Sequence, residues 1–355
     1  MAYTTIDKPT DYFNTVLYSG NETARSITGV GFQPDWVWIK DRSQAYNHHL
    51  FDSVRGATKR LKSDVTDAES TNAQTLTAFG SDGFSLGTDN ATNGNGSNVV
   101  SWNWLAGTSF SNDASATSVG TIDSSGSTNQ TAGFSIVSWT GTGSAGTVAH
   151  NLGSVPEWYI IKNRSDANNW AIYHHKSNSN SEQYALYLDG TSAATDDSGL
   201  ANDTAPTSTV FSLTNGNYGN QSSYNYIGYF FSEVKGYSKF GSYTGNGSTD
   251  GTFVYTGFKP AFVIRKVTSA TSDWLMQDNK RSESGGFNQI RNYLFPNSNQ
   301  AEVSNQDYFN IDFLSNGFKM RSTDGGANGS GQTYIYMAFA ENPFVTSTGI
   351  PTTAR

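Results

Sequence analysis

The chain contains the same long phrase three times. Residues 34–43, PDWVWIKDRS, return as residues 156–165, PEWYIIKNRS, and more loosely as residues 260–266, PAFVIRK. Pro34 and Pro156 are 122 positions apart, and Pro156 and Pro260 are 104 positions apart. Intervals of that size correspond to whole domains and not to the short modules of a solenoid. The sequence therefore predicts three similar domains, and comparing them separates shared fold features from features of one copy.

Further matching segments follow each copy in a fixed order. A short strand begins near Gly83, Val210 and Gly317, and it is followed by a Gly-, Asn- and Ser-rich loop. An aromatic strand then closes each copy at residues 100–104, 226–230 and 334–339. Aromatic and β-branched residues favour strands, and glycine and asparagine permit the tight turns between them. We therefore expect an all-β chain of three tandem similar β-sandwich (jelly-roll-like) domains.

The spacing of the copies also predicts the domain boundaries. The first interval is longer because it includes a Ser-, Thr-, Gly- and Asn-rich stretch, residues 107–130, which we expect to be a linker. The three repeats then occupy residues 1–106, 131–238 and 239–355. Residues 53–70 are charged but lack a sustained apolar stripe at helical spacing, so no long helix is expected.

Charge and composition exclude several classes of function. The 30 acidic and 22 basic residues give a net charge of −8, whereas a general nucleic-acid binder needs clustered Lys and Arg against phosphates. No apolar run approaches the length of about 20 residues that a membrane span requires, and the polar start of the chain does not predict a signal peptide. The absence of cysteine excludes disulfides and thiolate metal sites, and it fits synthesis in a reducing cytoplasm.

Most apparent chemical motifs recur at matching positions of the copies, which favours a role in the fold. Residues 141–146, GTGSAG, match a dinucleotide-binding pattern but precede a strand-like segment instead of a helix. Asp35 and Glu157 are matching positions, and the third copy has Ala261 there. The Asp- and Asn-rich residues 82–98 are interpreted as a hairpin loop, with an ion site as the alternative. Adjacent histidines on a strand point to opposite faces. We therefore predict no catalytic residue, no metal ligand and no cofactor.

Aromatic side chains supply the remaining candidates for a binding site. Five tryptophans occupy repeated strand positions and are expected in the core, namely Trp36, Trp102, Trp158, Trp170 and Trp274. Loops hold binding residues on a rigid scaffold, so aromatic residues in loops that differ between copies are better candidates. Tyr46, Tyr218 and Tyr224 are the predicted glycan-binding residues, because their amphipathic rings can stack on sugars.

Several phrases resemble a recurrent domain of tailed-bacteriophage structural proteins. These phrases are residues 31–40, GFQPDWVWIK, residues 50–56, LFDSVRG, residues 238–247, SKFGSYTGNG, and residues 334–341, YIYMAFAE. Proteins with such domains are tail fibres or other virion components. The resemblance implies a non-enzymatic virion structural protein, either a tail fibre, a tail appendage or a capsid-surface spike, that contributes to host attachment. It transfers no catalytic residue to this chain.

The expected partners follow from this resemblance. They are other virion proteins, further copies of the chain in a trimer or dimer, and a host-surface glycan, with neither nucleic acid nor a membrane span. The protein is expected on the virion after synthesis in the host cytoplasm. A lectin-like adhesin module is the alternative function. A polysaccharide depolymerase is a further alternative, although no catalytic carboxylate pair is recognised in the sequence.

Overall fold

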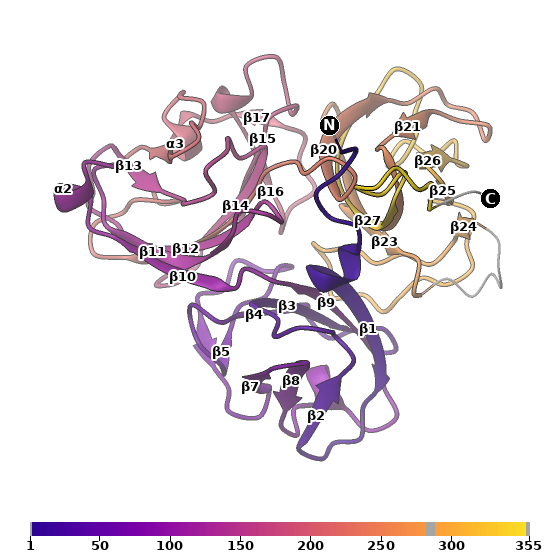
Figure 1. Ribbon diagram of the computed structural model, residues 1–355, viewed down its shortest axis with the longest axis horizontal. Helices are drawn as coiled ribbons and strands as arrows, with labels where there is room; N and C mark the ends of the chain where they lie inside the picture. Colours follow the sequence, from indigo (N-terminus) through magenta and orange to yellow (C-terminus); the bar gives the residue numbers. More distant parts are fainter. Residues whose placement is uncertain (1, 282–287, 353–355) are drawn as a thin grey trace.

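The computed structural model describes residues 2–281 and 288–352. The chain is nearly all β, as the composition predicts. Figure 1 shows three groups of strands around a common centre, one for each copy of the repeated phrase. We call the group with strands β1 to β9 the first unit, the group with β10 to β19 the second unit, and the group with β20 to β27 the third unit.

The elements have the following bounds. The first unit contains η1 (Pro9–Asp11), β1 (Phe13–Ser19), β2 (Arg25–Thr28), β3 (Trp36–Asp41), β4 (His49–Asp52), β5 (Lys59–Arg60), β6 (Ser70–Thr71), β7 (Leu76–Gly80), β8 (Gly83–Leu86), α1 (Asn90–Asn93) and β9 (Asn98–Trp104). The second unit contains β10 (Thr108–Asn112), α2 (Ala114–Thr117), β11 (Ser124–Asn129), β12 (Phe134–Thr140), β13 (Gly146–Ala149), β14 (Trp158–Asn163), β15 (Ala171–His174), η2 (Ser181–Gln183), β16 (Tyr184–Tyr187), β17 (Thr195–Asp196), α3 (Ser198–Ala201), β18 (Val210–Leu213) and β19 (Asn225–Phe231). The third unit contains β20 (Ser238–Thr244), β21 (Phe253–Tyr255), β22 (Phe258–Val267), β23 (Leu275–Asp278), β24 (Gln289–Ile290), β25 (Ile311–Leu314), β26 (Gly317–Met320) and β27 (Thr333–Pro343).

The three units share one strand order. Their inner sheets run β1-β9-β3-β4 in the first unit, β12-β19-β14-β15 in the second and β20-β27-β22-β23 in the third. All neighbouring strands in these sheets are antiparallel. The repeated proline phrase supplies the third strand of each order, and the aromatic closing strand supplies the second. A second set of strands faces each inner sheet, and it is paired as β2-β8-β7, β13-β18 and β21-β26-β25-β24.

Each inner sheet is apolar on both faces because both faces are covered. In β3, Val37 and Ile39 pack into a cluster with residues of the facing sheet, such as Phe84. Trp36 and Trp38, at the alternate positions, pack into a different cluster that contains residues of all three units. Side chains alternate between the two faces of a strand, so a strand between two cores must be apolar at nearly every position. All six residues of β3 and of β14 are buried.

The three units are arranged in a ring (Figure 1). The cluster that they share lies at the centre of this ring and is rich in aromatic side chains. Trp104, Phe231 and Phe339 are matching residues of the three closing strands, since they pair with Trp36, Trp158 and Phe262, the third residues of the three copies of the phrase. The centroid of the Phe339 ring lies 5.8 Å from that of Trp104 and 6.0 Å from that of Phe231. Trp36 of the first unit stacks on Tyr229 of the second at 4.4 Å. Aromatic rings at these separations form favourable pairs. The contacts between them join the three units through one core.

The stretch 107–130, expected as a linker, contains structured elements instead. β10 and β11 form a hairpin, and β11 pairs along its whole length with β12. The hairpin extends the inner sheet of the second unit to eight strands, β10-β11-β12-β19-β14-β15-β16-β17. Composition did not distinguish this hairpin from a linker, because its strands are rich in serine and its polar side chains lie partly in solvent. The charged residues 53–70 contain the short strand β5 and the first residue of β6.

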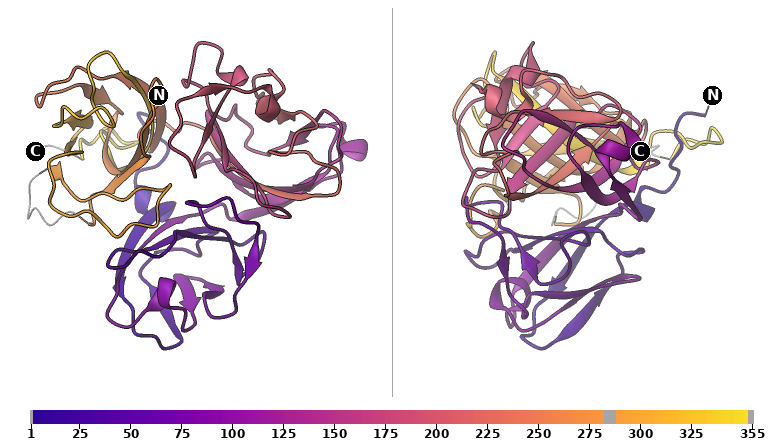
Figure 2. Two further views of the ribbon diagram at one scale, coloured as in Figure 1. Left: turned by 180° about the vertical axis from the view of Figure 1, so that it is seen from behind. Right: turned by 90° about the vertical axis from the view of Figure 1, so that its left-hand side faces the viewer.

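The two ends of the described chain meet at the third unit. The Ser347 backbone N–H donates to the carboxylate of Asp7 at 2.6 Å. In the right-hand view of Figure 2, the N-terminal segment projects from one side of the three units. None of the helices among residues 2–281 and 288–352 is both long and apolar enough to span a bilayer.

Candidate functional site

Similar contacts occur between each pair of neighbouring units. A polar group that recurs at matching positions of these contacts has a structural role. At matching positions, a backbone hydrogen bond joins each unit to the next. These bonds run from Glu69 N–H to Arg164 O at 3.0 Å, from Ala194 N–H to Thr268 O at 2.9 Å, and from Glu302 N–H to Arg42 O at 2.9 Å. The first unit therefore contacts the second, the second contacts the third, and the third contacts the first. We call these three contacts the 1–2, 2–3 and 3–1 seams.

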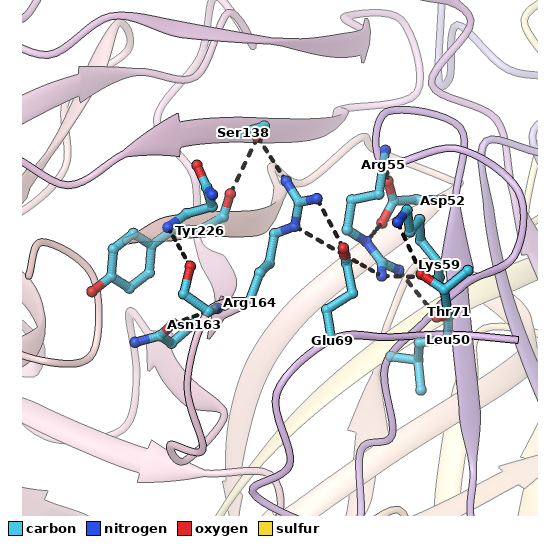
Figure 3. A network of polar contacts seen from close by, with 12 residues as sticks. Leu50, Asp52, Arg55, Lys59, Glu69, Thr71, Ser138, Asn163, Arg164 and Tyr226 are labelled. Atoms are coloured by element: carbon cyan, nitrogen blue, oxygen red, sulfur yellow. Dashed lines mark hydrogen bonds and ion pairs between the residues drawn. The ribbon is translucent and has the colours of Figure 1, made fainter. Parts of the chain in front are cut away.

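Two of the seams contain a buried ionic network. At the 1–2 seam, Arg55 pairs with Asp52 and with Glu69, and Glu69 also accepts from Arg164 at 2.9 Å (Figure 3). Tyr229 of the second unit completes the network by donating to Asp52 at 2.7 Å. Burial penalises an isolated charge, but the nearby carboxylates hold the Arg55 pKa above its ordinary value.

The 3–1 seam repeats this network at matching positions. Arg281 pairs with Asp278 at 2.6 Å and with Glu302 at 2.5 Å, and Glu302 binds Arg42 of the first unit at 2.6 Å. The indole N–H of Trp102 donates to Asp278 at 2.9 Å, in the place that Tyr229 has at the other seam. Both networks connect buried residues of two units, so we assign them to holding the ring together.

The 2–3 seam replaces every charged member of this network. His174 stands where the other seams have Asp52 and Asp278, because each of the three pairs with the third residue of its repeated phrase. Three further substitutions accompany it, namely Ser177 for Arg55 and Arg281, Ala194 for Glu69 and Glu302, and Thr268 for Arg42 and Arg164. The buried His174 instead lies 3.3 Å from the backbone oxygen of Tyr336. Burial keeps the His174 pKa well below its ordinary value, so the position that Asp52 and Asp278 hold in the other seams is uncharged here at neutral pH.

A groove of 400 Å³ lies at the 2–3 seam and has walls from both units. The second unit contributes His175, Lys176 and Glu233, and the third unit contributes residues of β20 and β21 and Tyr336. In Figure 1, β20 lies on the side of the third unit that faces the second. A Cβ at Gly241 in β20 would lie 2.6 Å from the Tyr336 hydroxyl, so a side chain here would displace the Tyr336 ring. We call this feature the seam groove.

Titratable side chains gather beside the seam groove. Glu157 accepts the backbone N–H of Glu233 at 3.1 Å, and its other oxygen lies 4.0 Å from Nδ1 of His175. Burial, with repulsion from Glu233, raises the pKa of Glu157 to about 7. Glu233 itself forms an ion pair with Lys239 at 3.1 Å. The groove therefore offers acceptors, donors and charges of both signs within one small volume.

A larger groove of 640 Å³ lies beside the β10–β11 hairpin. Its wall includes hydroxyl groups of Ser111, Ser125 and Ser138 and the acids Asp113 and Asp123. Both acids already accept backbone N–H groups at the start of α2, so they are explained by the local fold. The seam groove is the stronger candidate because it combines exposed aromatic rings of one unit with polar side chains of another.

The predicted glycan-binding tyrosines lie outside the seam groove. Tyr46 is 37 % exposed in the loop between β3 and β4. Tyr218 and Tyr224, between β18 and β19, are partly buried against the core of the second unit, and Tyr218 accepts a hydrogen bond from Tyr187 at 3.0 Å. Tyr46 belongs to another unit, and no hydrogen bond or ring contact joins it to the other two within residues 2–281 and 288–352.

The glycine motif and the Asp- and Asn-rich loops have a common structural role. A Cβ on Gly20, Gly141 or Gly245 would lie 2.1 to 2.3 Å from a backbone oxygen of the loop before the closing strand. Each loop contributes one buried asparagine that accepts the backbone N–H after that glycine. The pairs are Asn93 with Asn21, Asn220 with Thr142, and Asn328 with Asn246. The motif at 141–146 is therefore a close packing of two loops, as the comparison of the copies predicts.

The remaining sequence candidates have structural partners too. Asp35 accepts the backbone N–H groups of Ala106 and Gly107, and His48 accepts from the indole of Trp38 at 2.9 Å. All five tryptophans expected in the core are buried. Within the part of the chain that the structure describes, no group of three or more His, Cys, Asp or Glu side chains could hold a metal ion.

Sequence reasoning did not find the seam groove, although one signal was available. Phe253 and Tyr255 are aromatic residues of a strand whose matching strands have small or polar residues. A residue-by-residue comparison of β2, β13 and β21 therefore identifies these two aromatic residues as a feature of the third unit alone. The sequence does not show that these rings lie near His175 and Glu233 of the second unit, because that proximity arises only when the units pack together.

Comparison with known proteins places the chain in a family. A family model described as a domain of unknown function (DUF7483) matches residues 8–343, which is almost the whole chain and all three units. No curated protein and no solved structure shows significant similarity to the chain. The chain belongs to the DUF7483 family.

Proposed function

We propose that the chain is a non-enzymatic structural protein of a bacteriophage virion, a tail-fibre, tail-appendage or capsid-surface component that contributes to host attachment. The observation that most supports this role is the closed ring. Its three repeats are joined by one aromatic core, by matching backbone hydrogen bonds and by two buried ionic networks. A ring of this kind is rigid, and without cysteine its stability does not depend on redox conditions.

In this proposal each unit is a β-sandwich that takes the place of one subunit of a trimer. The inner sheets face the centre of the ring, and the outer strands face the surroundings. Virion proteins are commonly assembled with closed symmetry. Three matching units on one chain are suited to a partner with threefold symmetry, because each unit can present the same surface to one subunit of that partner.

Locating the protein on a purified particle tests this role. Gold-labelled antibody against the chain should mark a fixed position on the tail or on the capsid surface, seen by electron microscopy. Particles that lack the chain should lose that label and adsorb more slowly to host cells. Absence of the chain from purified particles would overturn the proposal.

The seam groove favours a second role that is compatible with the first, that of a glycan-binding adhesin. The fluorescently labelled protein should then bind intact host cells. A depolymerase would release reducing ends from host polysaccharide, and incubation of the protein with that polysaccharide measures this directly. Release of reducing ends in proportion to protein concentration would contradict the non-enzymatic proposal.

A further inference from the structure

The seam groove has an aromatic wall that the other two units lack. Phe253 and Tyr255 are 44 % and 54 % exposed, while Val254 between them is buried. Side chains two positions apart on a strand point to the same face, so the two rings lie side by side along β21. The matching residues are Ser26 and Thr28 in β2 and Thr147 and Ala149 in β13, according to the strand registers.

The aromatic surface continues beyond the groove. The Tyr3 hydroxyl lies 3.3 Å from that of Tyr255 and donates to the Gly257 carbonyl at 2.7 Å. The Lys235 ammonium lies 4.5 Å from the centroid of the Tyr3 ring. Rings held by hydrogen bonds at one end have little freedom, and a ligand that stacks on them therefore loses little conformational entropy.

Polar groups line the opposite side of the seam groove. Nε2 of His175 lies 2.8 Å from the Phe240 backbone oxygen, which fixes the orientation of its ring. Lys176 and Ser242 are exposed in the groove wall, and the Glu233–Lys239 ion pair lies beside them. A groove of 400 Å³ is within the range of about 300 to 1,000 Å³ of small-molecule sites.

We propose that the seam groove binds a saccharide segment of a bacterial surface polysaccharide. A pyranose ring has one face of C–H groups, which packs on an aromatic ring, and a rim of hydroxyls, which both donate and accept hydrogen bonds. The exposed rings of β21 can pack against the C–H face of the sugar. The donors and acceptors of the second unit can form hydrogen bonds with its hydroxyl groups. The proposal rests on the attachment role proposed above and names its ligand and its site.

The groove has walls from two units, so ligand binding and the 2–3 seam are coupled. A saccharide in contact with both β21 and His175 binds only when the seam is closed. It therefore stabilises the folded ring by mass action. Saturating saccharide should raise the thermal midpoint of the intact protein, which gives a second readout besides binding.

The test uses the full chain on an array of purified bacterial capsular polysaccharides and lipopolysaccharides. The informative variant is Phe253→Thr with Tyr255→Ala, because these are the residues that β13 has at the same positions and a strand of this fold accepts them. We expect the wild type to bind at least one glycan of the array, and the double variant to bind it at least tenfold more weakly. Tyr308→Ala is the matched control, since Tyr308 is 66 % exposed in another region of the same unit.

The possible results separate this inference from the attachment role. If the wild type binds host cells and a glycan and the double variant loses both, the inference is supported. Equal glycan binding by the double variant, or binding to cells without binding to any glycan of the array, overturns the inference and leaves attachment standing. If the wild type binds neither cells nor glycans, both fail. A double variant with an unchanged thermal midpoint shows that a loss of binding does not come from unfolding.

Discussion

At the residue scale, Glu302 joins the third unit to the first within the ionic network of the 3–1 seam. Its side chain is 2 % exposed and pairs with Arg281 and with Arg42. Removing one partner from a buried ionic network leaves a charge without compensation, which costs about 3 to 5 kcal/mol. We expect Glu302→Gln to lower the free energy of unfolding by about 3 kcal/mol, measured by urea denaturation.

The surface pair Lys8–Asp11 gives the control for this measurement. Its side chains are 72 % and 50 % exposed, and exposed pairs contribute between about 0 and 1 kcal/mol. Asp11→Asn should therefore change the free energy of unfolding by less than about 1 kcal/mol. If Glu302→Gln and Asp11→Asn have equal effects, the buried network does not stabilise the seam.

Glu157 makes the 2–3 seam sensitive to pH. Its pKa is raised from 4.5 to about 7 by burial and by Glu233, so the folded chain holds this proton more tightly than the unfolded chain does. The carboxyl therefore lowers the stability of the folded state as pH rises from about 4.5 to 7. Glu157→Gln should be more stable than the wild type by about 2 kcal/mol at pH 8, a value reduced for the side chain's partial exposure, and equal to it at pH 4. An equal difference at both pH values would contradict this origin.

At the element scale, the strands that repeat could be predicted and the contacts between units could not. The closing strands expected near residues 100, 226 and 334 are confirmed as β9, β19 and β27, because their aromatic composition is intrinsic to each strand. Their apolar character on both faces fits strands that are covered on both sides. The partner on the second face was not predictable, since Trp36 meets Tyr229 only after the ring closes. The hairpin in 107–130 was missed for the opposite reason, because a serine-rich strand has no hydrophobic pattern.

The β10–β11 hairpin covers an edge that the other two units leave open. β11 pairs with β12, whereas the matching strands β1 and β20 are the end strands of their sheets. Open edges favour association with other chains. Deletion of residues 107–130 leaves residues 105, 106 and 131–133 between β9 and β12, which resembles the link 232–237 between β19 and β20.

We expect this deletion variant to fold but to be less stable and to associate. It loses Ile122, which is 4 % exposed in the core of the second unit, and burial of such a side chain contributes about 2 kcal/mol. The thermal midpoint should fall by several degrees, measured by circular dichroism, and size-exclusion elution should become dependent on concentration. A variant that stays monodisperse at every concentration would show that the hairpin does not protect this edge.

At the scale of the whole molecule, the shared core makes the three units one cooperative structure. The largest buried cluster contains residues of every unit, so separating any unit exposes tryptophan and phenylalanine rings to water. Independent domains would instead unfold in three steps. The same core occupies the surface that three separate units would use to form a trimer, so we predict a single chain in solution. The trimer or dimer expected from the sequence would need another interface.

Calorimetry and light scattering test both consequences on one sample. We expect a single thermal transition whose calorimetric and van't Hoff enthalpies agree, and a molar mass close to the 38.4 kDa of one chain. Glu302→Gln should move the whole transition to lower temperature without splitting it, because a defect at the 3–1 seam weakens the core shared by all units. Three resolved transitions would show that the units are independent, and a mass of three chains would show that a further interface exists outside the aromatic centre of the ring.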